Sequence, residues 1–272
     1  MTHDSLYMNL DYTLSEMNHK YGKNIHLLNS PYLLTLLEKI CTDQVVQPLF
    51  TEYIRKAYSM LFTQAGSHFL STEVIKSETR MHEFHKEGVY KGDAFKPNTK
   101  AVVVDLARAG MIPSQLIYNE LNYLFDFKNI RQDHFYAARK TNELGEVTGV
   151  DISGSKIGGD INDAYVIFPD PMGATGGTIS EAISFYKKQV PGKCIKFITL
   201  HLIITPEYIQ RIQKDHPEVE VYSIRLDRGL STQKALQSIP GEYIKEEKGL
   251  NANQYIIPGA GGIGELLNNS FV

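Results

Sequence analysis

The segment from Val166 to Ile179 holds the residue types with the clearest chemical potential in the chain. It consists of a hydrophobic run, an acidic residue, a turn of small residues and a helical pattern. Backbone N–H groups in such a turn approach a phosphate closely, and the helix N-terminus adds the positive end of its dipole. Asp170 suits ribose hydroxyls or a Mg²⁺-bound water. The predicted phosphate-binding residues are Asp170, Pro171, Met172, Gly173, Ala174, Thr175, Gly176, Gly177 and Thr178.

The same turn has a second interpretation. A strand–turn–helix connection can use its glycines for tight packing alone, without any ligand. The turn is not a Walker A loop, because the pattern Gly-x-x-x-x-Gly-Lys-Ser/Thr is not met. The turn by itself therefore leaves a binding role and a packing role open.

A glycine cluster at residues 259–264 is the second motif. It formally satisfies Gly-x-Gly-x-x-Gly, but a dinucleotide site would need a helix and a returning strand, for which residues 265–272 leave no room. Main-chain N–H and C=O groups of these glycines could meet the edge of a flat polar ring. A glycine-rich loop without a ligand is the alternative.

The phosphate turn resembles that of a known enzyme family. Uracil phosphoribosyltransferases carry Asp-Pro-Met-Leu-Ala-Thr-Gly-Gly-Ser in their phosphoribosyl pyrophosphate loop, and only Gly173 and Thr178 differ here. Further pieces of that family's pattern follow in the same order. They are Arg108-Ala109-Gly110, Arg139 with Thr141 and Glu143, Lys156-Ile157 with Asp160-Ile161, and Leu250-Asn251 with Tyr255 to Gly259.

The resemblance implies a fold, a reaction and a set of roles. It implies a phosphoribosyltransferase-like fold and the conversion of uracil and phosphoribosyl pyrophosphate to UMP and pyrophosphate, as in pyrimidine salvage. Asp170, Arg108 and Arg139 are the implied catalytic residues, with both arginines on the pyrophosphate and Mg²⁺ held mainly by substrate oxygens. The implied uracil contacts are Ile256, Gly261, Gly262 and Ile263. A homodimer or a higher homo-oligomer is the implied assembly.

The sequence departs from the family pattern at the glycine cluster. The family continues Pro-Gly-Leu-Gly-Asp-Ala-Gly-Asp-Arg, whereas this chain has Gly262, Ile263, Glu265 and Leu266 in place of Asp, Ala, Asp and Arg. Residues 231–247 form an additional insertion. Two alternatives therefore stay open: a non-catalytic protein that binds a nucleotide or phosphoribosyl pyrophosphate, and a phosphoribosyltransferase for another base.

The elements that would position these motifs alternate between strands and helices. Strand patterns at 101–106, 134–138, 164–168, 195–203 and 219–226 are interleaved with helical patterns at 113–125, 179–188 and 206–214. This alternation predicts a single α/β domain with a mainly parallel sheet flanked by helices. Residues 1–75, with a helical pattern from about 31 to 66, are predicted to form a helical N-terminal extension. The charged, irregular stretch 76–98 is predicted to be a connection, with short strands as an alternative.

Composition limits the possible partners. The 272 residues carry 28 Lys+Arg and 31 Asp+Glu, a net charge of -3, so we expect no nucleic-acid partner. The two cysteines, and a histidine pair at 82 and 85 without a third ligand, predict no metal site of the protein's own. Neither a secretory signal nor a membrane span is evident, and we expect a cytoplasmic protein.

Overall fold

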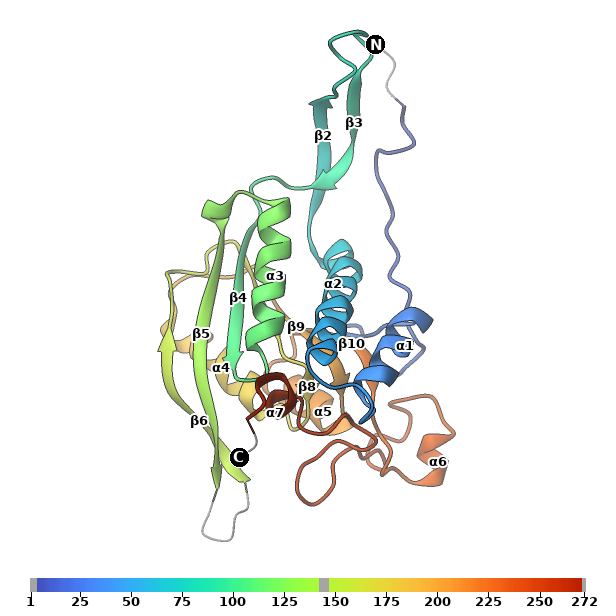
Figure 1. Cartoon of the computed structure of the whole chain (residues 1–272), viewed down its shortest axis with the longest axis vertical. Helices are drawn as coiled ribbons and strands as arrows, with labels where there is room; N and C mark the ends of the chain where they lie inside the picture. The colour runs from blue at the N-terminus through green and yellow to red at the C-terminus, as the bar shows by residue number, and fades with distance from the viewer. Residues whose placement is uncertain (1–3, 142–146, 271–272) are drawn as a thin grey trace.

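The computed structural model describes residues 4–141 and 147–270, apart from the side chains of residues 137–151, and this part of the chain contains a central sheet of eight strands. The sheet runs in the order β1 (Ile25–Leu27), β10 (Glu220–Leu226), β9 (Lys196–Ile204), β7 (Ala164–Pro169), β4 (Lys100–Ala107), β5 (Ile130–Thr141) and β6 (Val147–Lys156), and β8 (Met172–Gly173) pairs with β9. The strands pair in parallel, except that β6 is antiparallel to β5. The predicted α/β fold with a mainly parallel sheet is confirmed (Figure 1).

Helices cover both faces of the sheet. On one face lie α1 (Pro31–Ile40), α2 (Leu49–Phe69) and α3 (Met111–Leu124); on the other lie α4 (Gly177–Gln189) and α5 (Pro206–Asp215). Alternate residues of β4 belong to different cores: Val103 packs with α2 and α3, whereas Val102 and Val104 pack with α4 and α5. A strand covered on both faces needs a continuous hydrophobic run, which is the pattern that predicted β4.

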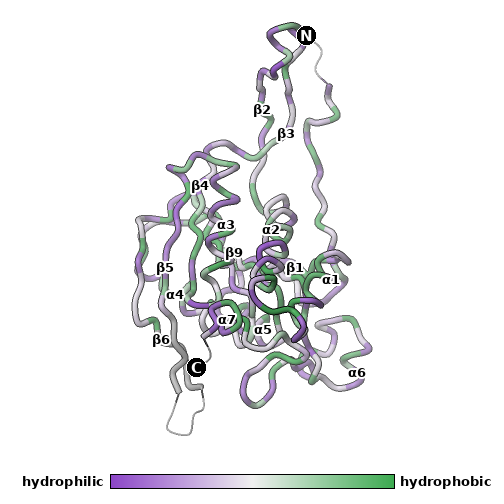
Figure 2. The backbone as a smooth tube through the Cα atoms, viewed as in Figure 1, coloured by the Kyte–Doolittle hydropathy of each residue, from purple (hydrophilic) through white to green (hydrophobic). Residues whose placement is uncertain are grey.

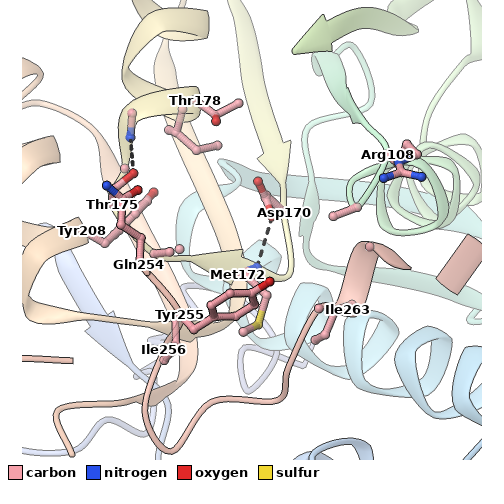
Figure 3. Close-up of a pocket in the computed structure, with 18 of the residues that line it drawn as sticks. Arg108, Asp170, Met172, Thr175, Thr178, Tyr208, Gln254, Tyr255, Ile256 and Ile263 are labelled. Carbon is pink, nitrogen blue, oxygen red and sulfur yellow. Dashed lines mark hydrogen bonds between the residues drawn. The ribbon is translucent and has the colours of Figure 1, made fainter. Parts of the chain in front are cut away.

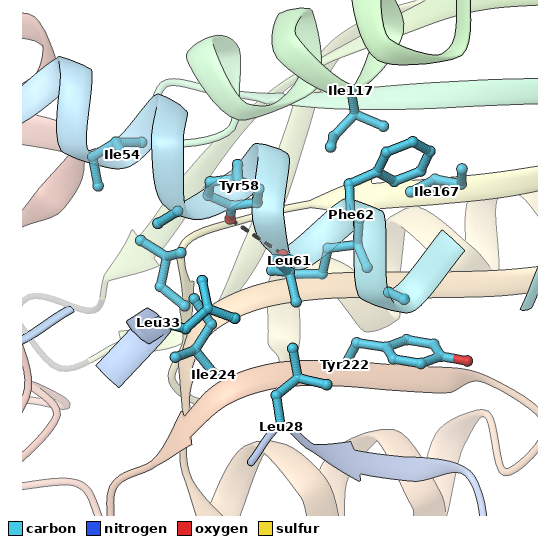
Figure 4. Close-up of a cluster of buried hydrophobic side chains, with 14 of the residues drawn as sticks. Leu28, Leu33, Ile54, Tyr58, Leu61, Phe62, Ile117, Ile167, Tyr222 and Ile224 are labelled. Atoms are coloured by element: carbon cyan, nitrogen blue, oxygen red, sulfur yellow. Dashed lines mark hydrogen bonds between the residues drawn. The ribbon is translucent and has the colours of Figure 1, made fainter. Parts of the chain in front are cut away.

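Helix α2 supplies much of the hydrophobic core between the sheet and the helices α1, α2 and α3 (Figure 4). Ile54, Tyr58, Leu61 and Phe62 are at most 3% exposed, on the side of the helix that faces the sheet. Full burial of each such side chain stabilises the fold by about 1.5–3 kcal/mol. The Tyr58 hydroxyl, buried in apolar surroundings, donates to the Leu200 carbonyl at 3.2 Å, which satisfies its hydrogen-bonding requirement.

The N-terminal region differs from the predicted helical extension. The helices at 31–40 and 49–69 are present, but the preceding residues include β1, which pairs in parallel with β10 at the edge of the sheet. Because α1 and α2 bury their apolar faces on the sheet, they form part of its cover. The three residues of β1 are too short a run for hydrophobic periodicity to reveal.

The connection predicted at 76–98 contains a two-stranded hairpin, so the short strands left open by the sequence are present. Strands β2 (Thr72–Glu78) and β3 (Val89–Phe95) pair antiparallel and project from the body of the molecule (Figures 1 and 2). Most of their side chains are exposed or half-buried, so the sequence lacks the alternation of a half-buried strand. The hairpin is also contacted from the N-terminal segment, where the Tyr7 carbonyl accepts the N–H of Asp93 at 2.7 Å.

The insertion after β10 is anchored by one buried carboxylate. Glu247 accepts from Arg228 Nη1 at 2.9 Å, from the Gly241 N–H at 2.8 Å and from the Tyr21 hydroxyl. The segment leaves and rejoins the body at one place, where the N–H of Leu230 donates to the Lys248 carbonyl at 2.9 Å. Three short helices complete the described structure: η1 (Phe127–Asn129), α6 (Gln233–Leu236) and α7 (Ile263–Asn268). Among the described residues, no helix is long and apolar enough to cross a membrane.

Candidate functional site

A cavity of about 650 Å³ lies at the carboxyl ends of β4 and β7 (Figure 3). In open parallel sheets this edge is the usual place for ligands. The turn after β4, the turn after β7 and the C-terminal segment all contribute to its walls. The lining residues are Ala107, Arg108, Ala109, Asp170, Met172, Gly173, Ala174, Thr175, Gly176, Gly177, Thr178, Ile179, Tyr208, Gln254, Tyr255, Ile256, Gly261, Gly262, Ile263, Gly264 and Glu265.

The turn after β7 has the geometry that an anion site requires. The Asp170 carboxylate accepts the Met172 N–H at 3.1 Å, which fixes the start of the turn. Gly176 has φ +75° and precedes α4, a left-handed conformation that favours glycine. The helix begins at Gly177, whose N–H donates to Thr175 Oγ1 at 3.4 Å. First-turn N–H groups lack acceptors within a helix, so the start of α4 offers donors to the cavity.

A buried hydrogen-bond chain supports this turn from behind. His201 Nδ1 is 2.6 Å from the Asp170 carbonyl, and its Nε2 is 2.7 Å from the Tyr208 hydroxyl. A carbonyl only accepts, so Nδ1 carries the proton and Tyr208 donates to Nε2. Thr199 Oγ1 lies 3.1 Å from the same hydroxyl. Burial lowers the pKa of His201 to about 3, because the charged imidazolium would lose its hydration.

Thr205 links the turn to the start of α5. Its Oγ1 donates to the Ala174 carbonyl at 2.7 Å and accepts the Tyr208 N–H at 3.0 Å, and its own N–H donates to the Gly173 carbonyl at 3.1 Å. A Cβ on Gly173 would lie 2.8 Å from Ile204 Cγ2 and 3.0 Å from Tyr208 Cδ2. Glycine at 173 therefore allows the close approach of the turn to α5.

Arg108 lies in the short turn after β4 and lines the same cavity. Its Nη1 donates to Ser270 Oγ at 2.7 Å and lies 3.3 Å from the Ser270 carbonyl, so the guanidinium is held by the C-terminal residues. Arg139 belongs to β5, where its backbone is in register with Val150. Its side chain lies outside the described residues, and its predicted role stays a prediction.

The C-terminal wall is held by a buried ion pair. Asp227 accepts from Arg225 at 2.6 and 2.7 Å and from the Gly259 N–H at 2.7 Å. Ile256 and Ile263 are buried and line the cavity, as do Gly261 and Gly262. All four residues predicted to contact a base thus face the same cavity as the phosphate turn.

Some lining residues were not predicted, and one predicted residue lies elsewhere. Tyr208, Gln254 and Glu265 line the cavity without a predicted role, and Gln254 has φ +62°, which is uncommon for a residue with a side chain. No single-residue signal marks them, because they reach the cavity only through the packing of α5, α7 and the C-terminal loop. Pro171 is absent from the lining within the described residues, and its carbonyl accepts the N–H groups of Leu202 and Ile203 at 3.1 Å.

Metal ligands of the protein's own are not grouped in the described part of the chain. No cluster of three or more His, Cys, Asp or Glu side chains there could hold an ion. His82 lies in the hairpin turn, where its Nε2 is 3.4 Å from Glu78 Oε1. The cavity itself is lined by two carboxylates, those of Asp170 and Glu265. This donor set fits a Mg²⁺ ion that arrives on an oxygen-rich ligand.

Comparisons with known proteins agree with this geometry. Residues 27–242 match the family model of uracil phosphoribosyltransferase, a range that includes Arg108 and the phosphate turn and ends before Gln254. Uracil phosphoribosyltransferases of Mycoplasma genitalium and Campylobacter fetus subsp. fetus are each 28% identical, over 86% and 91% of this chain and 94% and 99% of theirs. The AQ2163 protein from Aquifex aeolicus has a similar fold, with a TM-score of 0.66 at 23% identity over 89% of this chain and 97% of that one.

Proposed function

The chain belongs to the uracil phosphoribosyltransferase family, and we propose that it transfers ribose 5-phosphate from phosphoribosyl pyrophosphate to uracil, giving UMP and pyrophosphate. The observation that carries the proposal is the shared cavity. The phosphate turn, Arg108 and the glycine-rich C-terminal wall all line it, so the reacting parts of both substrates can meet there. Such a reaction would serve pyrimidine salvage.

The described residues suit a reaction that proceeds by positioning. The turn from Ala174 to Thr178 would bind the 5′-phosphate through its N–H groups, and Asp170 would accept hydrogen bonds from the ribose hydroxyls. Arg108 would leave Ser270 and pair its planar guanidinium with pyrophosphate oxygens. Fixed donors aimed at developing charge, together with alignment of the two substrates, can supply most of the rate enhancement.

The bond changes need no side-chain nucleophile. The anomeric C–O bond breaks with its electron pair leaving on pyrophosphate, and a C–N bond forms to the base, whose ring N–H proton is released to solvent water. We propose that Mg²⁺ enters with phosphoribosyl pyrophosphate, held mainly by substrate oxygens, and neutralises charge on the pyrophosphate. The neutral amides of the turn and the Arg108 guanidinium are then the protein's own contribution to binding the anion.

The direct test is a turnover assay. Purified protein is incubated with uracil, phosphoribosyl pyrophosphate and Mg²⁺, and UMP is separated by chromatography. We expect UMP from the wild type and a large loss for Arg108→Ala. Arg55→Ala, an exposed arginine on α2, is the matched control and keeps its activity. Absence of a nucleotide product with uracil or any other base, at high enzyme concentration, would contradict the proposal.

A second candidate is transfer to a base other than uracil. It is favoured by Ile263, which lines the cavity at a position where the family pattern has Ala. A larger side chain there changes the shape available to the ring. Assays with a panel of purine and pyrimidine bases distinguish the two. Calorimetry that shows binding of phosphoribosyl pyrophosphate without turnover of any base would instead indicate a non-catalytic binding protein.

A further inference from the structure

Glu265 places a carboxylate beside a glycine in the wall of the cavity. Both Gly262 and Glu265 line the cavity, and Glu265 is half-buried in the first turn of α7. A Cβ built on Gly262 would lie 2.1 Å from Glu265 Oε2 and 2.7 Å from its Cδ. The Glu265 carboxylate therefore fills the space in which a side chain at residue 262 would begin.

The backbone does not explain the glycine at 262. Its φ of −85° and ψ of 84° keep it outside the left-handed region, so a residue with a side chain is tolerated in that conformation. The obstacle is the space already taken by Glu265. The related sequence pattern has Asp at both positions, whereas this chain has Gly262 and a Glu265 that is longer by one methylene. The longer side chain at 265 thus brings its carboxylate to the place where a side chain at 262 would begin.

The Glu265 carboxylate has no partner among the described residues: no hydrogen bond or ion pair reaches it there. Arg108, the basic side chain in the same cavity, is bonded to Ser270 instead. The helix of Glu265 lies against the Arg108 turn, since a Cβ on Gly264 would be 3.4 Å from Ala109 Cβ. A bare carboxylate at this end of the cavity would repel a bound anion unless a cation lies between them.

We propose that Glu265 contacts, through coordinated water, the divalent cation that accompanies the pyrophosphate group of the substrate. The proposal rests on the proposed function, which places the pyrophosphate at Arg108. Oxygen ligands and retained water are what Mg²⁺ prefers. The carboxylate of Glu265 stands in for an acidic side chain at residue 262 and gives this end of the cavity its only described acidic group besides Asp170.

The test compares binding of two ligands by calorimetry, with and without Mg²⁺. We expect Glu265→Gln and Glu265→Ala to weaken binding of Mg²⁺–phosphoribosyl pyrophosphate about 10- to 100-fold, as loss of an outer-sphere partner does. Binding of ribose 5-phosphate, which lacks the pyrophosphate, should not change. Glu38→Gln, an exposed glutamate on α1, is the matched control. Thermal unfolding checks that each variant is folded.

A double variant tests whether side chains at 262 and 265 can place a carboxylate in the same part of the cavity wall. Gly262→Asp/Glu265→Ala should recover most of the Mg²⁺-dependent affinity that Glu265→Ala loses. Gly262→Asp alone should bind no more tightly than the wild type, because two carboxylates then compete for one place. The inference is overturned if Glu265→Ala binds like the wild type or if the double variant recovers nothing. A wild type that does not bind phosphoribosyl pyrophosphate overturns the proposed function as well. A wild type that turns over, with Glu265→Ala equally active and equally tight, overturns this inference alone.

Discussion

On the phosphate-turn side of the cavity, the supporting hydrogen bonds come from β9 and α5, which follow directly in the chain. His201 and Thr205 hold the carbonyls of Asp170 and Ala174, and Tyr208 fills the space beside Gly173. On the C-terminal side, the start of the glycine cluster is held by a distant ion pair. Asp227, more than thirty positions before the glycine cluster, holds the Gly259 N–H while it is paired with Arg225.

The two sides of the cavity are therefore held in place by different kinds of interaction. The phosphate turn is held by several neutral hydrogen bonds, so no single contact carries it. The start of the glycine cluster is held by a charged, buried pair, and the loss of one partner leaves the other without compensation.

The largest loss of stability is expected from removal of Asp227, which holds the start of the C-terminal wall. Asp227 is 2% exposed, so Asp227→Ala leaves the Arg225 guanidinium without its counter-charge and the Gly259 N–H without its acceptor, and it should lower the free energy of unfolding by about 3–5 kcal/mol. Urea unfolding measures this. Glu246→Ala, which removes an exposed 4.0 Å pair with Lys234, is the control and should cost about 0–1 kcal/mol. Equal costs for the two variants would show that the buried pair does not hold the wall.

Arg108→Ala should affect the ligand and not the fold. The guanidinium is exposed and bonded only to Ser270 among the described residues, so the free energy of unfolding should hardly change. Loss of charged hydrogen bonds to pyrophosphate should weaken binding of phosphoribosyl pyrophosphate by about 1.5–3 kcal/mol, as calorimetry would show. Unchanged affinity would remove Arg108 from the site.

Gly173→Ala tests how tightly the phosphate turn is packed. The added Cβ would meet Ile204 and Tyr208 at 3.0 Å or less, and overpacking of this kind costs about 1–3 kcal/mol. Gly66→Ala in α2 is the matched control, because its Cβ would make only ordinary contacts at 3.6 Å and should stabilise the helix by about 0.5–1 kcal/mol. Urea unfolding of both variants gives the two values. A neutral Gly173→Ala would mean that the turn moves without cost.

His201 should make stability depend on pH. Its pKa of about 3 in the fold lies below the ordinary value of 6.5, so between these values the unfolded chain binds a proton that the folded chain does not. Stability contributed by the neutral imidazole is therefore lost as pH falls below 6.5. The loss is about 0.7 kcal/mol between pH 7 and pH 6 and approaches 1.4 kcal/mol per pH unit below that.

The measurement compares urea unfolding of the wild type and His201→Asn across this range. The asparagine amide can donate to the Asp170 carbonyl in place of Nδ1, but it does not titrate. The variant should therefore show a flatter pH profile than the wild type. Parallel profiles would mean that His201 takes up a proton within the fold.

Elements with a regular hydrophobic pattern were predictable from the sequence. Strand β4 and helix α4 were expected because a strand covered on both faces and an amphipathic helix leave clear periodicities. Strand β6 was not predicted, since it is an edge strand with glycines at 149 and 154 that weaken the pattern. The pairing and bounds of the hairpin were not predictable for a related reason, because neither of its faces is buried.

The site was predictable where it is contiguous in the chain. The turn from Asp170 to Thr178 shows its chemistry in consecutive residues, and all but Pro171 reach the cavity. Glu265 and Tyr208 could not be placed this way. Their roles depend on where α7 and α5 come to lie, which follows from tertiary packing rather than from residues near them in sequence.

The insertion at residues 231–247 has a consequence for protein engineering. Its two ends meet where the Leu230 N–H donates to the Lys248 carbonyl, so extra length adds little closure cost, about 0.6 kcal/mol for each doubling. The segment is nevertheless joined to the body, because Glu247 accepts from Tyr21 and the Pro240 carbonyl accepts the Lys20 N–H at 2.7 Å. A foreign peptide should therefore be tolerated best at an exposed position such as Gln237, and least at Pro240 or Glu247.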